Sequence, residues 1–593
     1  MPIESTMPKG PSEKESATLI EVALGRVPAD MVITHARVLN VYTGEWLKDC
    51  AVSIKGRFIV HVGAEALEAI GENTQEIDAK GQVLVPGFID GHTHLTWLVS
   101  MPAFLPYAIV GGTTTVITET METFPVGGLA GLSDILDSFG GQPIKALALA
   151  PAGIATSPAA HGIDMADLDE LLARSDVVGL GESYWQSVLQ TPEVMLPIIE
   201  ACKKTGKSIE GHTAGASGKK LMAYVACGVG SCHEPILPEE VLERLRLGIY
   251  VMIREGNVRR DLENTIAVKD AGVDLRRLIL VTDGVSPQGL VKNGYLEKVL
   301  QKAIDLGYDP VQAIRMVTLN VAEHFKLDHL IGGIAPGRCA DLVILPDEKT
   351  IRAKYVISNG VVVAKDGQVL VAPRRHDFPP QTRQTVRLDH PLKADDFKIA
   401  APSSGTKATC RVIEMVTDLV TTERHIELPL ENGCINLLSG KGLNKVAAVE
   451  RSQGDGQTFV GLIKDFGLQK GAVACSAAWD TADIIVVGAD NGDMALAVNR
   501  VKDLNGGIVV CVGGEVLAEV ALPILGVISD QPMESLAAGL DSVNATLLDL
   551  GVTFPDALLS LVTLTASAIP YLRICEKGLV NLKDGKPKPL IVG

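Results

Sequence analysis

VLVPGFIDGHTH (residues 83–94) carries an apolar run directly into a pair of histidines. Seven further apolar runs follow, separated by longer helical stretches, which is the pattern of parallel βα units. The runs are VLVPGFI (83–89), TTTVIT (113–118), ALALA (146–150), VVGLG (177–181), KSIEG (207–211), VGSC (229–232), IYVMIR (249–254) and LILVT (278–282). Eight strands close a (β/α)8 barrel, so we predict an α/β fold with a TIM-like barrel over residues 81–330.

The segments on either side of this region have a different sequence pattern. Residues 26–80 and 331–371 read as short strands and turns, and Asn359-Gly360 is a hairpin signal. We therefore predict that the two segments pair into one composite β-sandwich. Residues 1–25 read as a polar N-terminal tail. A linker rich in Pro and Arg (372–383) precedes a C-terminal mixed α/β domain over residues 384–593.

Composition and charge exclude several classes of protein. The 593 residues exceed the size of a single core, and 47% hydrophobic and 21% charged residues are typical of globular domains. A formal net charge of -17 disfavours nucleic acid as a partner. The most apolar long stretch, residues 507–528, contains Glu515, Glu519 and Pro523, which disfavours a membrane span.

The compartment is predicted from the N-terminus and the cysteines. The first residues lack a basic segment followed by an apolar one, so they do not read as a secretion signal. The ten cysteines form no C-x-x-C pair, and free thiols suit a reducing compartment. We therefore expect a cytoplasmic protein.

Potential metal ligands follow the apolar runs. In a parallel barrel the active site forms at the carboxyl ends of the strands, so residues directly after each run converge on one rim. Those residues are His92, His94, Glu182, His212, His233 and Asp283. A single histidine at a strand end is more often a surface or hydrogen-bonded residue than a ligand. The interpretation rests on all of them occupying strand ends together.

Imidazole and carboxylate ligands in this number suit two divalent ions such as Zn, Mn or Fe. His92 and His94 are two residues apart on an extended segment, so their side chains point to the same side. Glu182 has two oxygens and can bridge both ions. Water held between two cations is activated as a nucleophile, and Asp283 beside it can act as the general acid–base. We assign catalysis to Asp283, Glu182 and His233.

The motif PGFIDGHTH resembles the amidohydrolase superfamily, and residues 25–593 resemble the bacterial adenine deaminase family. Further matching segments are GTTTVIT (112–118), VVGLGE (177–182), GHTAGASGKKLMAYVACGVGSCHE (211–234), IREG (253–256), LVTDG (280–284), AIRMVTLNVAEHF (313–325), IAPGRCADLVIL (334–345), VGLIKDFGLQKGAVACS (460–476) and DIIVVGADNGDMALAVNR (483–500). The resemblance implies a binuclear Mn or Fe site held by the six residues named above. It also implies that glutamate replaces the carboxylated lysine of other amidohydrolases.

Several positions depart from the family pattern. Acidic or imidazole groups of that pattern are replaced in this chain by Thr96, Met121, Gly284, Ser286, Ser452, Trp479 and Ala482. The proposed metal ligands stay while polar groups around them change. This pattern indicates retained hydrolysis with an altered substrate pocket, and it predicts that adenine is a poor substrate.

The residues that we predict to bind substrate are Thr96, Trp97, Glu119, Met121, Glu122, Arg254, Glu255 and Trp479. The leading hypothesis is hydrolysis of a C–N bond in a nitrogen heterocycle, such as deamination of adenine. The alternatives are ring opening of a cyclic amide, lactam or hydantoin, and a metal-binding paralogue without activity. We expect two divalent ions per chain, a small-molecule heterocycle as substrate, no nucleic-acid or membrane partner, and a homo-oligomer of two or more chains.

Overall fold

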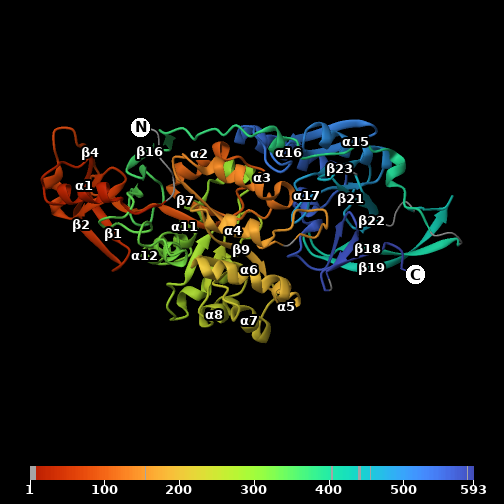
Figure 1. Cartoon of the computed structure of the whole chain (residues 1–593), viewed down its shortest axis with the longest axis horizontal. Helices are drawn as coiled ribbons and strands as arrows, with labels where there is room; N and C mark the ends of the chain where they lie inside the picture. Colours follow the sequence, from red (N-terminus) through yellow and green to blue (C-terminus); the bar gives the residue numbers. More distant parts are fainter. Residues whose placement is uncertain are drawn as a thin grey trace.

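The computed structural model describes residues 8–153, 155–401, 405–437, 442–454, 456–583 and 585–592. Three regions follow one another along its long axis: a β-sheet containing the N-terminal strands at one end, a barrel in the middle, and a C-terminal domain at the other end (Figure 1). Within these ranges, no helix is both long enough and apolar enough to cross a membrane.

The central region contains eight parallel strands. Five form one sheet in the order β10-β9-β8-β7-β6, and three form another in the order β11-β12-β13. Their bounds are β6 (Phe88–Thr93), β7 (Thr113–Thr118), β8 (Lys145–Ala150), β9 (Val177–Tyr184), β10 (Ser208–His212), β11 (Ser231–Cys232), β12 (Tyr250–Arg254) and β13 (Leu278–Val281). The predicted barrel strands are therefore present, and the sixth is the shortest of them.

A backbone hydrogen bond joins the two sheets at each seam. The Gly230 amide donates to the Ile209 carbonyl at 2.8 Å, and the Asp283 amide donates to the His92 carbonyl at 3.1 Å. Every residue of β7 is buried, as expected for a strand covered on both faces. The two joined sheets enclose the barrel core.

Helices lie between the barrel strands and follow the last of them. They are α2 (Met101–Gly111), α3 (Phe124–Phe139), α4 (Met165–Ala173), α5 (Trp185–Gln190), α6 (Pro192–Thr205), α7 (Gly218–Val225), α8 (Pro238–Arg246), α9 (Leu262–Thr265), α10 (Pro287–Asn293), α11 (Leu296–Asp305), α12 (Pro310–Met316) and α13 (Leu319–His324). The strongly amphipathic α11 buries Leu296, Val299 and Leu300 on one face. This alternation of strands and helices is the predicted α/β architecture.

The two flanking β segments pair with each other in one mixed sheet. Strand β5 of the first segment pairs antiparallel with β14 of the second, from Val83 opposite Leu345 to Pro86 opposite Leu342. The sheet consists of β1 (Met31–Asn40), β2 (Glu45–Lys55), β3 (Phe58–Val62), β4 (Gln75–Asp78), β5 (Val83–Pro86), β14 (Leu342–Leu345), β15 (Tyr355–Ser358), β16 (Val361–Lys365) and β17 (Gln368–Val369). One buried cluster contains apolar side chains of both segments.

The run VLVPGFI contributes strands to two sheets rather than to one. Its first half is β5 of the composite sheet, and its second half begins β6 of the barrel. Gly87 lies between them, where an added Cβ would come within 2.2 Å of Thr114 Oγ1. By strand pairing the barrel thus begins at Phe88 rather than at residue 81.

The N-terminal segment was predicted to be a polar tail, but it contains a helix. Residues Glu13–Ala23 form α1, which is capped by Ser12 and Glu15 in a reciprocal capping box. Val22 is fully buried, and Leu19 packs against the composite sheet. Residues 1–7 of the predicted tail lie outside the described residues.

The C-terminal domain is a mixed α/β unit, as predicted. Its main sheet has the order β20-β19-β18-β22-β21-β24-β23-β25-β26. Its elements are β18 (Lys407–Met415), β19 (Thr421–Glu431), β20 (Cys434–Ile435), β21 (Leu443–Glu450), β22 (Thr458–Lys464), β23 (Ala472–Cys475), β24 (Asp483–Gly488), β25 (Gly507–Val512), β26 (Glu515–Ala521), β27 (Leu572–Cys575), β28 (Gly578–Asn581), β29 (Lys586–Lys588), α15 (Asn491–Asp503), α16 (Met533–Asp549) and α17 (Ala557–Val562).

The loop after β6 is bound directly to this domain. The Leu98 amide donates to the Val527 carbonyl at 2.9 Å, and the Ser529 amide donates to the Leu98 carbonyl at 2.9 Å. Trp97 Nε1 donates to the Ala477 carbonyl at 2.8 Å. The barrel rim and the C-terminal domain therefore share backbone hydrogen bonds.

A buried ion pair also joins the barrel to the composite sheet. Lys145 Nζ on β8 lies 2.7 Å from both carboxylate oxygens of Asp341, and the two side chains are 0% and 4% exposed. Removing one partner leaves the other charge buried without compensation. We expect Lys145→Met to lower the free energy of unfolding by about 3–5 kcal/mol, measured by urea denaturation.

The matched control is Lys407→Met, which removes an exposed lysine paired with Glu427. This change is expected to leave the urea midpoint unaltered, because exposed ion pairs contribute little. Equal effects of the two substitutions would contradict a structural role for the buried pair.

Candidate metal centre

Six side chains converge at the carboxyl ends of the barrel strands. His92 lies in β6 and Glu182 in β9, while His212 is the last residue of β10. The others follow within two residues of a strand end: His94 after β6, His233 after β11 and Asp283 after β13. The parallel barrel brings together residues that are far apart in sequence, as the apolar runs predict.

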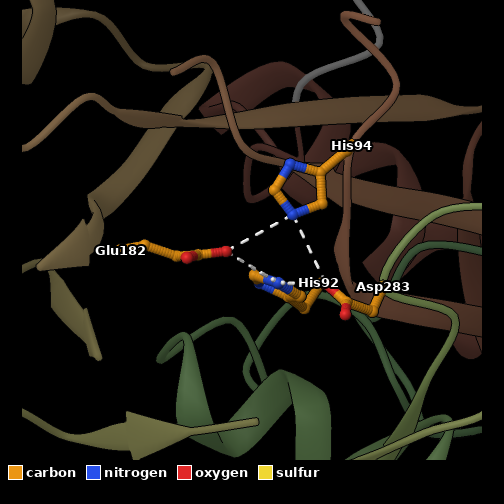
Figure 2. Close-up of side chains that lie close together, drawn as sticks. All are labelled: His92, His94, Glu182 and Asp283. Carbon is orange, nitrogen blue, oxygen red and sulfur yellow. Dashed lines mark hydrogen bonds and ion pairs between the residues drawn. The ribbon is translucent and has the colours of Figure 1, made fainter. Parts of the chain in front are cut away.

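Four of these residues form the first group, shown in Figure 2. His92 Nε2 lies 3.1 Å from Asp283 Oδ1 and 3.3 Å from Glu182 Oε1. His94 Nε2 lies 3.3 Å from Glu182 Oε1 and 3.4 Å from Asp283 Oδ1. The ligand atoms all lie within 4.8 Å of one another, which is close enough for one ion to contact every one.

Glu182 also belongs to a second group with His212 and His233. Its Oε2 lies 2.9 Å from His212 Nδ1, and its Oε1 lies 3.5 Å from His233 Nε2. One carboxylate therefore faces imidazoles from both groups. This is the arrangement that a bridging ligand between two ions requires.

Burial and charge make the centre a site for cations. Burial alone would lower the pKa of His92, but hydrogen bonds to Asp283 and Glu182 raise it to about 10. Burial would raise the pKa of Glu182, but the surrounding histidines hold it well below its usual range. Buried carboxylates need nearby positive charge. The nitrogen and oxygen donors fit Mn, Fe or Zn, so the residues present suit divalent metal.

Two further glutamates support the histidine pair from behind. His94 Nδ1 hydrogen-bonds with Glu122, and Thr96 Oγ1 donates to the other oxygen of Glu122 at 3.0 Å. Glu119 Oε1 lies 3.7 Å from His92 Nδ1. A carboxylate on the second ring nitrogen fixes the orientation and tautomer of a ligating histidine.

Glycine at position 181 makes room for Glu119. An added Cβ there would lie 2.2 Å from Glu119 Oε2, the atom that accepts the Glu182 amide at 3.3 Å. Burial, together with the charge of Glu182, raises the pKa of Glu119 to about 8. The GLGE motif thus places the glutamate that belongs to both ligand groups and accommodates the carboxyl group behind it.

Asp283 is held in an uncommon backbone conformation, with φ at 54°. Next to it, the Thr282 hydroxyl donates to Asp90 Oδ2 at 2.6 Å, and Tyr295 donates to the same oxygen at 2.6 Å. Asp90 lies in β6 and is fully buried. These bonds tie the end of β13 to β6 and set the direction of the Asp283 side chain.

Glu234 is a residue of the centre that sequence reasoning missed. Its Oε1 lies 3.2 Å from His233 Nε2 and 3.6 Å from His212 Nδ1, and it pairs with Arg254. Arg254 also approaches Asp283 Oδ2 at 3.4 Å. Burial would raise the pKa of Glu234, but Arg254 and the histidines lower it far below normal. Its position directly after His233 was the available signal.

A cavity of about 610 Å³ opens in front of the centre. Of the residues predicted to bind substrate, the ones that line it are Trp97, Met121, Glu122, Arg254 and Trp479. Thr96 and Glu119 lie behind the histidine pair instead. Glu255 pairs with Lys302 at 2.9 Å and does not line the cavity.

The C-terminal domain reaches the metal centre through Asp480 and Tyr184. Tyr184, two residues after Glu182, packs edge-to-face on His212 with ring centroids 5.0 Å apart. Its hydroxyl lies 3.4 Å from Asp480 Oδ2. The spacing of two on a strand, which points Tyr184 to the same side as Glu182, was the signal for this residue.

Comparison with known proteins agrees with this geometry. The model of the amidohydrolase family matches residues 83–370, and that of the adenine deaminase C-terminal domain matches residues 418–586. The barrel and its imidazole–carboxylate centre define a metal-dependent hydrolase that acts on C–N bonds.

Relatives that match nearly the whole chain identify the family within this class of hydrolase. The chain is 34% identical to an adenine deaminase of Clostridium botulinum (strain Langeland) over 575 residues, covering 95% of this chain and 96% of the relative. It is 36% identical to an adenine deaminase of Moorella thermoacetica over 596 residues, covering 98% and 99%. The chain belongs to the adenine deaminase family. Among solved structures, a β-aspartyl dipeptidase of Fervidobacterium islandicum AW-1 has a TM-score of 0.47 at 19% identity, covering 59% of this chain and 98% of that one.

The two ligand groups predict a graded loss of metal. We expect about two divalent ions per chain in protein grown with Mn, Fe and Zn, because the two groups of donors suit two ions. His212→Ala with His233→Ala should leave about one ion, whereas Glu182→Ala, which affects both groups, should leave almost none. Elemental analysis of the purified variants measures this.

His425→Ala is the control, because His425 lies on β19 in the C-terminal domain and is exposed. It should keep the full metal content. A content near zero in the unaltered protein, or an equal loss in all the variants, would contradict the two-group arrangement.

Proposed function

We propose that this chain hydrolyses a C–N bond of a nitrogen heterocycle at a binuclear metal centre. The observation that carries the proposal is the shared position of Glu182, which belongs to both ligand groups. The relatives named above are adenine deaminases, so deamination of adenine or a related aminopurine is the first candidate reaction.

We propose two ions per chain, Mn²⁺ or Fe²⁺ in the first place and Zn²⁺ as an alternative. His92, His94, Glu182 and Asp283 would hold one ion, and Glu182, His212 and His233 the other. When bound, the ions would lower the pKa of water and polarise the substrate. The carboxylates in both groups support harder ions, since sulfur is absent from the donor set.

Asp283 is the proposed general acid–base. Its Oδ1 faces the histidine pair, and its Oδ2 faces Arg254 at 3.4 Å. Burial would raise the pKa of Asp283, but hydrogen bonds to His92 and His94 and the charge of Arg254 hold it well below normal. Asp283 is therefore ionised and can accept a proton from the attacking water. Once protonated, an acid of low pKa gives the proton readily to the leaving nitrogen.

Glu182 and His233 have supporting roles in this proposal. Glu182 bridges the two groups, and His233 stacks on His92 with ring centroids 4.1 Å apart. Arg254 holds Glu234 and Asp283 together on one side of the cavity. These contacts orient the reacting groups before substrate binds.

A second candidate reaction is the ring opening of a cyclic amide, lactam or hydantoin. Positions that depart from the family pattern favour it where they line the cavity, and these are Met121, Gly284, Ser286 and Trp479. Thr96, Ser452 and Ala482 do not line it. Met121 and Trp479 place apolar atoms where the family pattern has imidazoles, so the hydrogen-bonding set offered to adenine is reduced.

We also propose a cytoplasmic location and a homo-oligomeric state. All ten cysteines are free, which supports a reducing compartment. Val194 and Leu196 on α6 and Met222 on α7 are exposed by 56%, 43% and 54%, and large exposed apolar side chains support contact between copies of the chain.

Asp283→Asn tests the acid–base assignment. The amide keeps the shape of the side chain but cannot shuttle a proton, so we expect kcat to fall by roughly a thousandfold or more. Most of the metal should remain, because the amide oxygen can still coordinate. Steady-state kinetics with elemental analysis measure both. A variant with near-normal kcat would move the proton-transfer role to another residue, with Glu122 the next candidate.

Adenine itself is expected to be a poor substrate. The assay is ammonia release from adenine by Mn- or Fe-loaded enzyme, beside hydantoins, lactams and oxidised purines. We expect kcat/KM for adenine below about 10⁴ M⁻¹s⁻¹, the lower end of the usual range for enzymes on their own substrates. A higher value would show that the replaced positions do not govern recognition, and would favour adenine as the substrate.

A further inference from the structure

The cavity in front of the metal centre has two walls of different chemistry. The barrel supplies one wall, which contains the histidines, Glu182, Asp283 and Arg254 beside apolar side chains such as Leu98 and Phe104. The C-terminal domain supplies the opposite wall, which we name the roof and define as the cavity-lining residues numbered above 400. Its apolar members include Leu419, Val420, Leu540, Leu558, Leu559 and Ile569.

The carboxylate and amide side chains of the roof hydrogen-bond mainly within the C-terminal domain, whereas the buried Trp479 Nε1 has no partner among the described residues. Asp480 Oδ2 accepts hydrogen bonds from the amide and hydroxyl of Ser567 at 2.8 and 2.9 Å. Asp556 Oδ1 accepts the Leu559 amide at 2.9 Å, as the cap of α17. These carboxylates have partners without any ligand.

The side chain of Asn544, a third polar residue of the roof, is also hydrogen-bonded within the C-terminal domain. Its Nδ2 donates to the Pro555 carbonyl at 3.1 Å, and its Oδ1 accepts the Ala557 amide at 3.1 Å. Both ends of the amide are used inside the roof. The surface that the described roof presents to a ligand is therefore mainly apolar.

The roof is attached firmly to the barrel. The backbone bonds of Leu98 with Val527 and Ser529 hold the C-terminal domain, which carries the roof, beside the histidine pair. Trp97 of the barrel and Trp479 of the roof meet edge-to-face, with ring centroids 5.6 Å apart. The space between the two walls is thus preformed.

The size of the cavity exceeds what a single small ring would fill. A volume of about 610 Å³ lies within the range of pockets that bury drug-sized ligands. A bare heterocycle at the metal centre would leave the apolar roof in contact with water. An apolar group attached to the ring would displace that water and gain the free energy of apolar burial.

We propose that the substrate is a nitrogen heterocycle or cyclic amide that carries an apolar substituent. Its reacting C–N bond lies at the metal centre, and its substituent lies against the roof. This inference rests on the proposed function for the reaction, and it adds the substrate class. The roof thereby selects substrates that a pocket shaped for adenine alone would exclude.

Two homologous series test the proposal on metal-loaded protein. One is adenine with N9 substituents from hydrogen to hexyl, and the other is hydantoin with C5 substituents of the same lengths. Each buried methylene should raise kcat/KM about three- to fourfold until the cavity is filled. Equal kcat/KM along both series would overturn the inference and leave the hydrolase proposal standing.

A substitution in the roof supplies the structural arm of the test. Ala568 lines the cavity, and Ala568→Phe should fill part of the space and remove the dependence on chain length beyond the first few methylenes. Leu548→Phe is the matched control, because Leu548 on α16 is 43% exposed and does not line the cavity. The control should keep the dependence seen in unaltered protein.

A second variant guards against misfolding of the first. Ile569→Ala enlarges the roof and should shift the preferred substituent towards longer chains. Circular dichroism and metal content establish that each variant is folded. An unchanged preference in folded Ala568→Phe and Ile569→Ala would overturn the inference.

Calorimetric titration separates this inference from the proposed function. If metal-loaded protein turns over no compound of either series, the proposed function fails, and binding of the same compounds decides the inference alone. Affinity that rises about three- to fourfold per methylene supports the apolar roof as a binding surface. Affinity that is independent of chain length overturns it.

Discussion

The Glu182 carboxylate contacts imidazoles on two sides from one position. The other residues of the centre are arranged around this double contact. Glu182 Oε1 lies within 3.3 Å of both His92 and His94, while its Oε2 lies 2.9 Å from His212. Only a closed barrel brings strands β6 and β10 to the same carboxylate. The bonds across the seams, including the one from the Asp283 amide to His92, therefore belong to the site as much as to the fold.

The main elements of the fold are predictable because each one has a local pattern. Fully buried parallel strands read as apolar runs, and the runs alone indicate a barrel. The division of VLVPGFI at Gly87 is not visible in this way, because both halves are equally apolar and only the pairing of β5 with β14 separates them. Helix α1 did have a local signal, the Ser12 and Glu15 capping box, which its polar composition obscured.

The site shows where sequence reasoning reaches its limit. Strand-end positions predicted residues that the structure does bring together, because a parallel barrel aligns those ends. Arg254 and Glu255 were both predicted to bind substrate, yet neighbours on a strand point to opposite sides. Arg254 faces the cavity and Glu255 pairs with Lys302. Of the roof, only Trp479 was predicted to line the pocket, because the contacts of the other members join segments without any shared periodicity.

The backbone hydrogen bonds of Leu98 limit the exchange of the C-terminal domain by recombination. A residue four positions after a predicted metal ligand is hydrogen-bonded to Val527 and Ser529, so the two domains depend on each other at the level of the main chain. Recombination that exchanged the C-terminal domain for an unrelated one would leave the loop after His94 without its support.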